Sequence, residues 1–447
     1  MLIAQVAVLA NSVADTVMTG HYGAAHLAAV GIGAGIYVTV WIGLMGVLQA
    51  LSPIVARHFG AGEFAAIGVQ VRQGWLLAAV LGAVGLALLS FPRVLLELAH
   101  VPADVAPLAE AYLRAIAWGL PATLFVRVFY AFTPAVGRSR PVMAINLVAF
   151  AIKLPISYAL LHGLHGLPEL GAAGCAVGSV VMFWSMLLMA AVLLMVDPFY
   201  SRFDIFSRAA GAWRPHWGEI RRILGLGLPI SAAMLIEVTS FTFIALFLAQ
   251  LGATVSAAHQ VIANLAALLF MVPLSLGIGT QVLIGQALGR KDLHRAREVA
   301  LAGMRLAFVI AASLAVVLLV LRGRLLGLYT SDPAVLAIAL NLLPLLAAFH
   351  LFDALQGLAG QALRGYQQTA VPTLIYAGSL WGIGLGGGWW LAFAGVELPV
   401  FGIAWSPQGA WGMWAAAAAS LVVAAGGLVS YLLRISKPER AAALELA

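Results

Sequence analysis

Residues 228–249 read LPISAAMLIEVTSFTFIALFLA, a hydrocarbon run in which Glu237 is the only ionisable side chain. A helix needs about 20 consecutive apolar residues to cross the core of a bilayer. The run is therefore predicted to be a membrane-spanning helix with a carboxylate inside the membrane.

Two other apolar stretches also contain a single acid. LIAQVAVLANSVADTVMTG contains Asp15, and LLPLLAAFHLFDALQGLAGQAL contains Asp353. A charged side chain near the bilayer centre costs at least about 2.5 kcal/mol, and such residues mark ion, proton or substrate pathways. The alternative is that a fixed partner holds each acid for structural reasons. We expect the three acids to carry protons, ions or cationic substrates.

The composition indicates a polytopic membrane protein. The 447 residues are 63% hydrophobic and only 9% charged, whereas soluble domains have about 25% charged residues. The apolar runs are continuous and do not alternate with polar residues, which excludes a membrane β-barrel. We predict an all-α protein with twelve transmembrane helices. The predicted spans lie near residues 1–19, 25–55, 75–91, 106–134, 142–161, 171–196, 223–250, 255–288, 300–321, 335–362, 371–394 and 409–433.

Several other classes of function lack support in the sequence. It contains no phosphate-binding glycine loop and no metal-spaced His/Cys cluster, and its single cysteine excludes a disulfide framework. The net charge of +7 does not indicate nucleic acid, because basic residues in a membrane protein first report topology. We therefore predict neither enzyme activity nor a cofactor, and no nucleic-acid partner.

The basic residues are distributed unequally between the two sets of alternating loops. One set contains 18 of them and the other only three. By the positive-inside rule this places both termini and the central linker in the cytoplasm. The larger set comprises Arg57, Arg72, Arg138, Arg140, Arg202, Arg208, Arg214, Arg221, Arg222, Arg290, Lys291, Arg295, Arg297, Arg305, Arg364, Arg434, Lys437 and Arg440.

The chain contains an internal repeat at a constant offset of 229 positions. YGAAHLAA at 22–29 aligns with LGATVSAA at 251–258, and FGAGE at 59–63 aligns with LGRKD at 288–292. A six-span repeat keeps its orientation, so the halves are expected to be related by a pseudo-twofold axis along the membrane normal, as in transporters. The predicted organisation is an N-terminal lobe, a cytoplasmic linker and a C-terminal lobe, at residues 1–197, 198–222 and 223–447.

Five segments agree in sequence and order with one known family. They are ADTVMTGHYGAAHLAAVG, PELGAAGCAVGS, IEVTSF, VSAAHQVIAN and FDALQGLAGQALRGY. In them the chain resembles the multidrug and toxic compound extrusion family, most closely its NorM-type branch. The resemblance implies a twelve-helix, two-lobed antiporter that expels cationic and amphipathic drugs in exchange for sodium ions or protons.

The resemblance also implies roles for individual residues. Asp15 matches the acid of helix 1, Glu237 that of helix 7 and Asp353 that of helix 10. Gln260 and Asp332 match positions implicated in drug contact or in the roof of the cavity, and they are our candidate substrate-binding residues.

Two of the chain's departures from the family pattern bear on the candidate sites. Phe349 stands where NorM-type members usually have an aromatic residue, often Tyr; its ring still offers a cation–π face but lacks the hydroxyl. Lys153 and Ser157 replace paired asparagines, and a lysine there argues against a sodium site in the N-terminal lobe. Lys153 is instead expected to neutralise Asp15, with repulsion of substrate as the alternative.

The candidate coupling centre is the pair Glu237 and Asp353. Two carboxylates in one apolar cavity cannot both ionise cheaply, so they take up a proton or a cation. Sodium favours oxygen ligands, which the two acids, Thr239 and Ser240 could supply. The coupling ion is thus a proton or sodium. Lys153 and Phe349 favour the proton without abolishing a sodium site.

Three further side chains are weaker candidates. Gln260 and Asn264 are four residues apart on one helix face, which predicts a polar cavity wall or, equally, hydrogen bonding between helices. His350 could relay protons near neutral pH, although a buried histidine is often only a packing group.

The combined prediction is a multidrug efflux antiporter of a bacterial cytoplasmic membrane that works as a monomer by alternating access. Its expected substrates are amphipathic, mainly cationic drugs. One alternative is a flippase for lipid precursors, which should present a cationic cavity to phosphate. The other is a channel, which would show no stoichiometric counter-transport.

Overall fold

The structure is a computed structural model, and it is mainly helical. It describes residues 2–98, 101–102, 104–209, 211–394, 396–398, 403–405 and 407–446. In this part of the chain nine helices are long and apolar enough to cross a membrane, and a bent pair of helices adds a tenth. Two predicted spans remain, and they correspond to the first helix and to the segment from residue 370 to 394. Each of the twelve predicted spans thus corresponds to helical structure, and the all-α membrane fold agrees with the sequence prediction.

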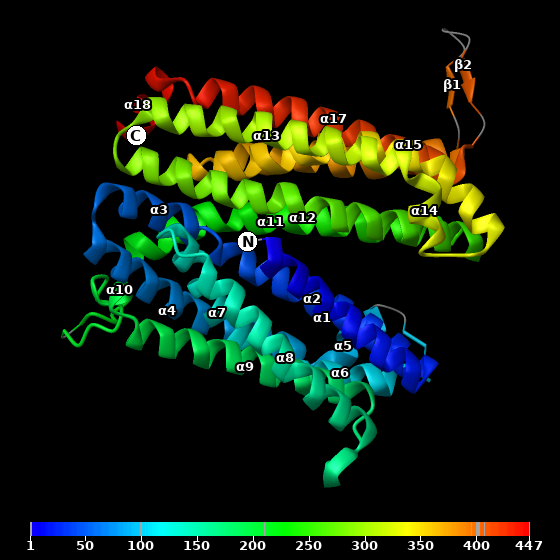
Figure 1. Cartoon of the computed structure of the whole chain (residues 1–447), viewed down its shortest axis with the longest axis horizontal. Coiled ribbons are helices and arrows are strands. Elements are labelled where there is room, and N and C mark those ends of the chain that lie inside the picture. Colours follow the sequence, from blue (N-terminus) through cyan, green and yellow to red (C-terminus); the bar gives the residue numbers. More distant parts are fainter. Residues whose placement is uncertain are drawn as a thin grey trace. The chain divides into compact units, whose positions relative to one another are not determined.

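The chain forms two compact units, Met1–Ser231 and Ala232–Ala447, here called the N-terminal and C-terminal units. Within each unit the long helices run roughly side by side (Figure 1). The boundary falls inside α11 (Trp217–Ala249), so the predicted linker belongs entirely to the N-terminal unit. The N-terminal unit contains α1 (Leu2–Tyr22), α2 (Ala24–Leu48), α3 (Leu51–Ala61), α4 (Phe64–Leu89), α5 (Pro92–Leu98), α6 (Ala106–Ala117), α7 (Leu120–Ala135), α8 (Arg140–His162), η1 (Leu164–Gly166), α9 (Ala172–Val196) and α10 (Pro198–Ser201).

The C-terminal unit contains the remaining elements and a short antiparallel hairpin. Val396 pairs with Trp405 and Leu398 with Ile403. Figure 1 shows this hairpin projecting away from the helices of the unit, at the upper right. The elements are α12 (Ala253–Gly289), α13 (Leu293–Val320), α14 (Arg322–Gly327), α15 (Pro333–Gly365), α16 (Ala370–Tyr376), the π-helical η2 (Ala377–Gly387) and η3 (Trp390–Ala394), β1 (Val396–Leu398), β2 (Ile403–Trp405), α17 (Gly409–Ile435) and α18 (Pro438–Leu446).

The internal repeat predicted from the sequence appears in the backbone of both units. Gly62 has φ 75° after α3, and Lys291, which is 229 positions later, has φ 60° after α12. In each turn the next amide, that of Glu63 or Asp292, donates at 3.0 Å to the carbonyl five residues earlier. A left-handed backbone conformation favours glycine, yet the second half has Lys291 at this position. The backbone conformation is therefore repeated although the residue type is not.

Helix α4 begins at Phe64, although its predicted span begins only at residue 75. The additional turns carry the buried Arg72, whose Nη1 donates to the Asp204 carbonyl at 2.5 Å and whose Nε donates to the Ala212 carbonyl at 3.0 Å. Both acceptors lie in the linker. A buried guanidinium needs such partners, and hydropathy alone does not report them. The linker is thus fixed on α4 by hydrogen bonds.

Helix α15 is the central element of the C-terminal unit. It packs along α12, α13 and α17. The close approach depends on small residues: a Cβ at Gly277 of α12 would lie 2.9 Å from Gln361, and one at Gly360 would lie 2.6 Å from the hydroxyl of Tyr376. Small residues at helix interfaces let membrane helices approach closely. This packing fixes where α15, and Asp353 with it, lies in the C-terminal unit.

Candidate functional site

A small cavity in the C-terminal unit contains two of the three predicted acids. Glu237 of α11 and Asp353 of α15 both line it, and the two carboxylates interact electrostatically. The cavity volume is about 20 Å³, and one water needs about 10–15 Å³. The cavity therefore fits a water or a small cation. Its other lining residues are Ser240, Phe241, Ile244, Phe349, Gln356, Leu380, Gly384, Ala417, Ser420 and Leu421.

Gln356 holds the carboxylate of Asp353. Its Nε2 donates to Asp353 Oδ1 at 2.8 Å, and both side chains are buried. The Tyr376 hydroxyl donates to the Gln356 carbonyl at 3.5 Å. Within the described residues the side-chain oxygen of Gln356 has no hydrogen-bond partner, which leaves it able to accept from a protonated or hydrated occupant of the cavity.

The hydroxyl groups beside Glu237 bond to their own helix. Thr239 Oγ1 donates to the Leu235 carbonyl at 2.6 Å, and Ser240 Oγ donates to the Ile236 carbonyl at 2.7 Å. Such back-bonding uses the hydrogen and leaves the oxygen lone pairs able to accept. Thr239 Oγ1 already accepts from the indole of Trp381 at 3.2 Å. Of the two hydroxyls only Ser240 lines the cavity.

Two aromatic rings, those of Phe241 in α11 and Phe349 in α15, line the cavity with the acids. The ring of Phe349 makes edge contacts with Phe241 and Trp414, with centroid separations of 5.9 Å and 5.5 Å. The ring of His259 also lies against Trp414, with a centroid separation of 5.8 Å. His350 is 1% exposed, and within the described part of the chain neither of its ring nitrogens has a hydrogen-bond partner. His350 does not line the cavity, so a relay role remains a prediction.

The other predicted substrate residues do not line this cavity. Gln260 and Asn264 are exposed on one face of α12. Asp332 is exposed at the start of α15, where its Oδ1 accepts from the Ala334 amide at 2.8 Å as a helix N-cap. At 1.5 Å per residue, Asp332 lies about 30 Å along the helix from Asp353. Drug contacts by these residues remain predictions.

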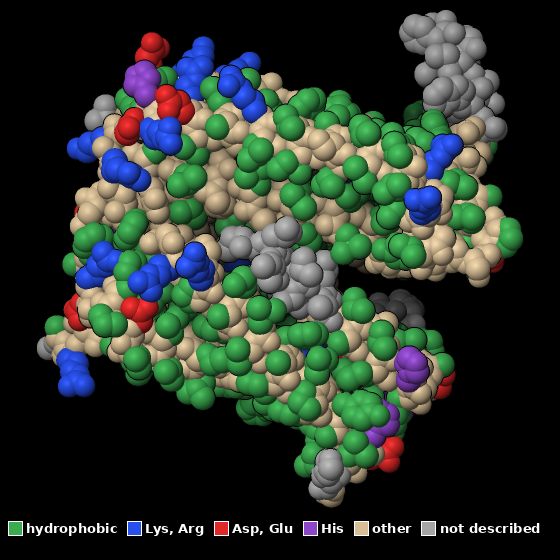
Figure 2. All heavy atoms as spheres, viewed as in Figure 1, with side chains coloured by type: hydrophobic (Ala, Val, Ile, Leu, Met, Phe, Trp, Pro, Cys, Tyr) green, Lys and Arg blue, Asp and Glu red, His purple; other side chains and the backbone are tan. Residues whose placement is uncertain are grey.

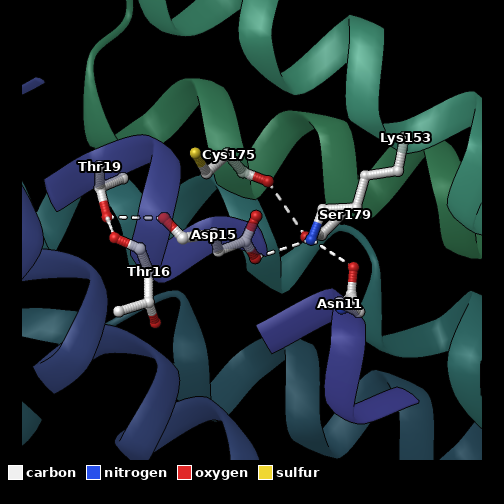
Figure 3. Close-up of polar contacts among 7 residues, drawn as sticks. All are labelled: Asn11, Asp15, Thr16, Thr19, Lys153, Cys175 and Ser179. Atoms are coloured by element: carbon white, nitrogen blue, oxygen red, sulfur yellow. Dashed lines mark hydrogen bonds and ion pairs between the residues drawn. The ribbon is translucent and has the colours of Figure 1, made fainter. Parts of the chain in front are cut away.

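The third acid lies in the N-terminal unit, where it pairs with a lysine. Lys153 Nζ of α8 is 2.7 Å from Asp15 Oδ2 of α1 and donates to Asn11 Oδ1 at 2.5 Å (Figure 3). Lys153 has no exposed surface and Asp15 is 7% exposed. The pair is therefore compensated within the protein, with a lysine held by two oxygens of one helix.

Tight packing of α8 against α9 closes this site. A Cβ at Gly178 of α9 would overlap the Ser157 hydroxyl of α8. Also on α9, Ser179 Oγ donates to the Cys175 carbonyl at 3.0 Å beside the pair (Figure 3). Glycine here allows the two helices to approach closely, which keeps water away from Lys153.

Two polar contacts at these sites did not follow from our reading of the sequence. Asn11 contacts Lys153 from one turn before Asp15, and Gln356 contacts Asp353 from one turn after it. Residues three or four apart share a helix face. A polar residue three or four positions from an intramembrane acid was therefore the sequence signal that could have predicted these contacts.

In the described part of the chain, nine or ten apolar helices long enough to cross a membrane, together with the carboxylates within its apolar helices, are features of a multi-pass membrane transporter. A family model described as MatE matches residues 1–159 and 229–390. The chain belongs to the MatE family.

Named relatives agree with this assignment. The chain is 43% identical over 436 residues to "Probable multidrug resistance protein NorM" of Aromatoleum aromaticum, an alignment that covers 97% of the chain and 92% of the relative. A solved structure of "MATE transporter NorM-NG", in a complex that includes a monobody, matches with a TM-score of 0.79 and 31% identity, covering 98% of the chain and 92% of that structure. "Crystal structure of MATE in the straight conformation" matches in fold, with a TM-score of 0.86 at 17% identity over 100% of the chain and 95% of that structure. The resemblance and the twelve-helix, two-lobe fold predicted from the sequence are confirmed.

A double-mutant cycle measures the pairing of Lys153 with Asp15. Lys153→Met or Asp15→Asn alone leaves one buried polar partner uncompensated, and we expect each to lower unfolding stability by about 3–5 kcal/mol. The double variant should lose less than the sum of the two. The measurement is denaturant unfolding of the purified protein in detergent.

The matched control is the exposed pair Arg295–Glu298, whose atoms are 3.1 Å apart. Cycles through Arg295→Met and Glu298→Gln should give a coupling of about 0–1 kcal/mol. Additive losses at Lys153 and Asp15 would exclude direct pairing in solution.

Proposed function

We propose that this chain is a multidrug efflux antiporter that exports amphipathic, mainly cationic compounds in exchange for an ion. Its membership of the MatE family, together with relatives whose names describe multidrug resistance proteins, supports this function. The solved relative that is 31% identical is itself named as a MATE transporter. Two lobes of six spans, residues 1–197 and 223–447, would alternate access, with residues 198–222 as the connection.

The cavity that contains Glu237 and Asp353 is the proposed exchange site. This one observation carries the proposal: two carboxylates share a cavity too small for a drug but large enough for a proton carrier or a small ion. An ion that neutralises the acids removes the negative charge that attracts a cationic drug. Each ligand then lowers the affinity for the other, which is the free-energy coupling that exchange requires.

We favour the proton as the coupling ion. The cavity lining is mainly apolar, and besides the two acids its polar side chains are those of Ser240, Gln356 and Ser420. A sodium ion prefers several oxygen ligands, whereas a proton needs only one carboxylate oxygen. In the N-terminal unit, Lys153 already neutralises Asp15.

Drug contacts are proposed at four side chains. The ring of Phe349 would face a cation from the cavity wall, and Gln260 and Asn264 would present polar groups from the exposed face of α12. Asp332 would contact the drug from the start of α15. A flippase for lipid precursors would require a cationic cavity for phosphate, and a cavity lined by two carboxylates does not favour that alternative.

The proposed location is a bacterial cytoplasmic membrane, with the chain acting as a monomer and both termini in the cytoplasm. Figure 2 shows Lys and Arg side chains gathered at one end of each unit. In the C-terminal unit this end contains Arg290, Lys291 and Arg295, whereas Arg322 and Arg324 lie in α14 at the other. The positive-inside rule supports a cytoplasmic position for the richer end.

Removing either acid of the cavity should abolish coupled efflux. Glu237→Gln and Asp353→Asn keep the shape but remove the titratable charge, so each should lower ion-driven efflux of ethidium at least about tenfold in cells with equal expression. The matched control is Glu298→Gln, which changes an exposed acid of α13 in the same unit. Normal drug resistance in both cavity variants would refute the exchange site.

The coupling ion is tested in proteoliposomes with one gradient at a time. A proton gradient in sodium-free medium should drive ethidium transport, and a protonophore should abolish it. A sodium gradient without a pH difference should give little transport. Strict sodium dependence would overturn the proton assignment, and ethidium movement without counter-transport of either ion would indicate a channel.

A further inference from the structure

The buried ion pair of the N-terminal unit contains a cation that belongs to the protein itself. The Lys153 ammonium has an amide oxygen of Asn11 at 2.5 Å and a carboxylate oxygen of Asp15 at 2.7 Å. Amide and carboxylate oxygens are also the ligands that hard metal cations such as sodium prefer. The ammonium occupies a position that is chemically suited to a small metal cation.

The site has more acceptor oxygens than the lysine uses. Within the described residues, Asp15 Oδ1 and the Ser157 hydroxyl oxygen are buried and have no hydrogen-bond partner. Ser157 lies one turn after Lys153 on α8, so the two side chains share a helix face. Most buried polar atoms in proteins have a partner. Asp15 Oδ1 is therefore a buried acceptor beside the ammonium that the lysine leaves unused.

Replacing Lys153 leaves the oxygens of the site in place, whereas replacing Asp15 removes a carboxylate oxygen. Shortening the side chain would leave Asp15 buried without its positive charge, a state that costs several kcal/mol. A sodium ion that entered the vacated space would supply the missing charge, with Asn11 and Asp15 as ligands. The native lysine makes this unnecessary.

We propose that Lys153 is a specificity-determining residue that fills a cation site of the N-terminal unit with its own ammonium, so that Asp15 holds no exchangeable sodium. The inference rests on the proposed function for its consequence: ion exchange in this chain is confined to the cavity of Glu237 and Asp353. A neutral, oxygen-bearing residue at position 153 converts the site into a sodium site.

The test measures sodium binding and needs no transport. Lys153→Asn adds an amide oxygen and removes the charge. For the purified full-length protein in detergent, we compare melting temperatures in sodium chloride and in N-methylglucamine chloride at equal ionic strength. Lys153→Asn should gain a sodium-dependent rise of roughly 2–4 °C beyond that of the unaltered chain. Adding Asp15→Asn to it should remove the gain.

Two further variants complete the experiment. Lys153→Met fills a similar volume without an oxygen and should gain nothing from sodium, whereas Lys153→Gln retains an amide and should respond like Lys153→Asn. If the amide variants fold only when sodium is present during purification, that rescue also supports the proposal. Equal loss of folded protein with and without sodium, no sodium gain, or a gain that survives Asp15→Asn would overturn it. None of these outcomes depends on drug transport, so they leave the proposed function to its own experiments.

Discussion

The structure depends on one constraint: a carboxylate inside a hydrocarbon layer must be compensated by a partner or be free to bind one. The N-terminal unit meets this constraint with a fixed partner, the fully buried Lys153 at 2.7 Å from Asp15. The C-terminal unit meets it differently, since Glu237 and Asp353 line a cavity with room for a small ligand. The two units repeat one backbone plan but compensate their acids in different ways.

This difference suggests how the two units divide their roles. A carboxylate that is paired with a protein ammonium cannot bind a cation unless the lysine moves, so we propose that the N-terminal acid contributes to structure and selectivity. Carboxylates that share a small cavity can exchange one ligand for another, because each bound cation or proton relieves the repulsion between them. The 2.8 Å hydrogen bond from Gln356 holds the Asp353 carboxylate in place.

Most of the fold could be predicted from the sequence because hydrocarbon runs determine where a chain crosses a membrane. The prediction failed to extend α4 to Phe64, since Arg72 is satisfied by carbonyls of the linker that no local pattern reveals. At the sites, the three acids stand out because each interrupts an apolar run. Gln356 was overlooked because amides are common in helices, and the position of Asp332 as an N-cap depends on where α15 begins.

The most direct test of the central claim is proton release on drug binding, measured with a pH indicator in a weakly buffered solution of the purified protein. If the cavity exchanges a drug for a proton, adding ethidium should release protons, and the variant with both Glu237→Gln and Asp353→Asn should release none. The Lys153–Asp15 pair should remain intact in that variant and contribute no release. The account would be contradicted if the unaltered chain bound ethidium without releasing protons or sodium, and if the double variant bound it with the same affinity.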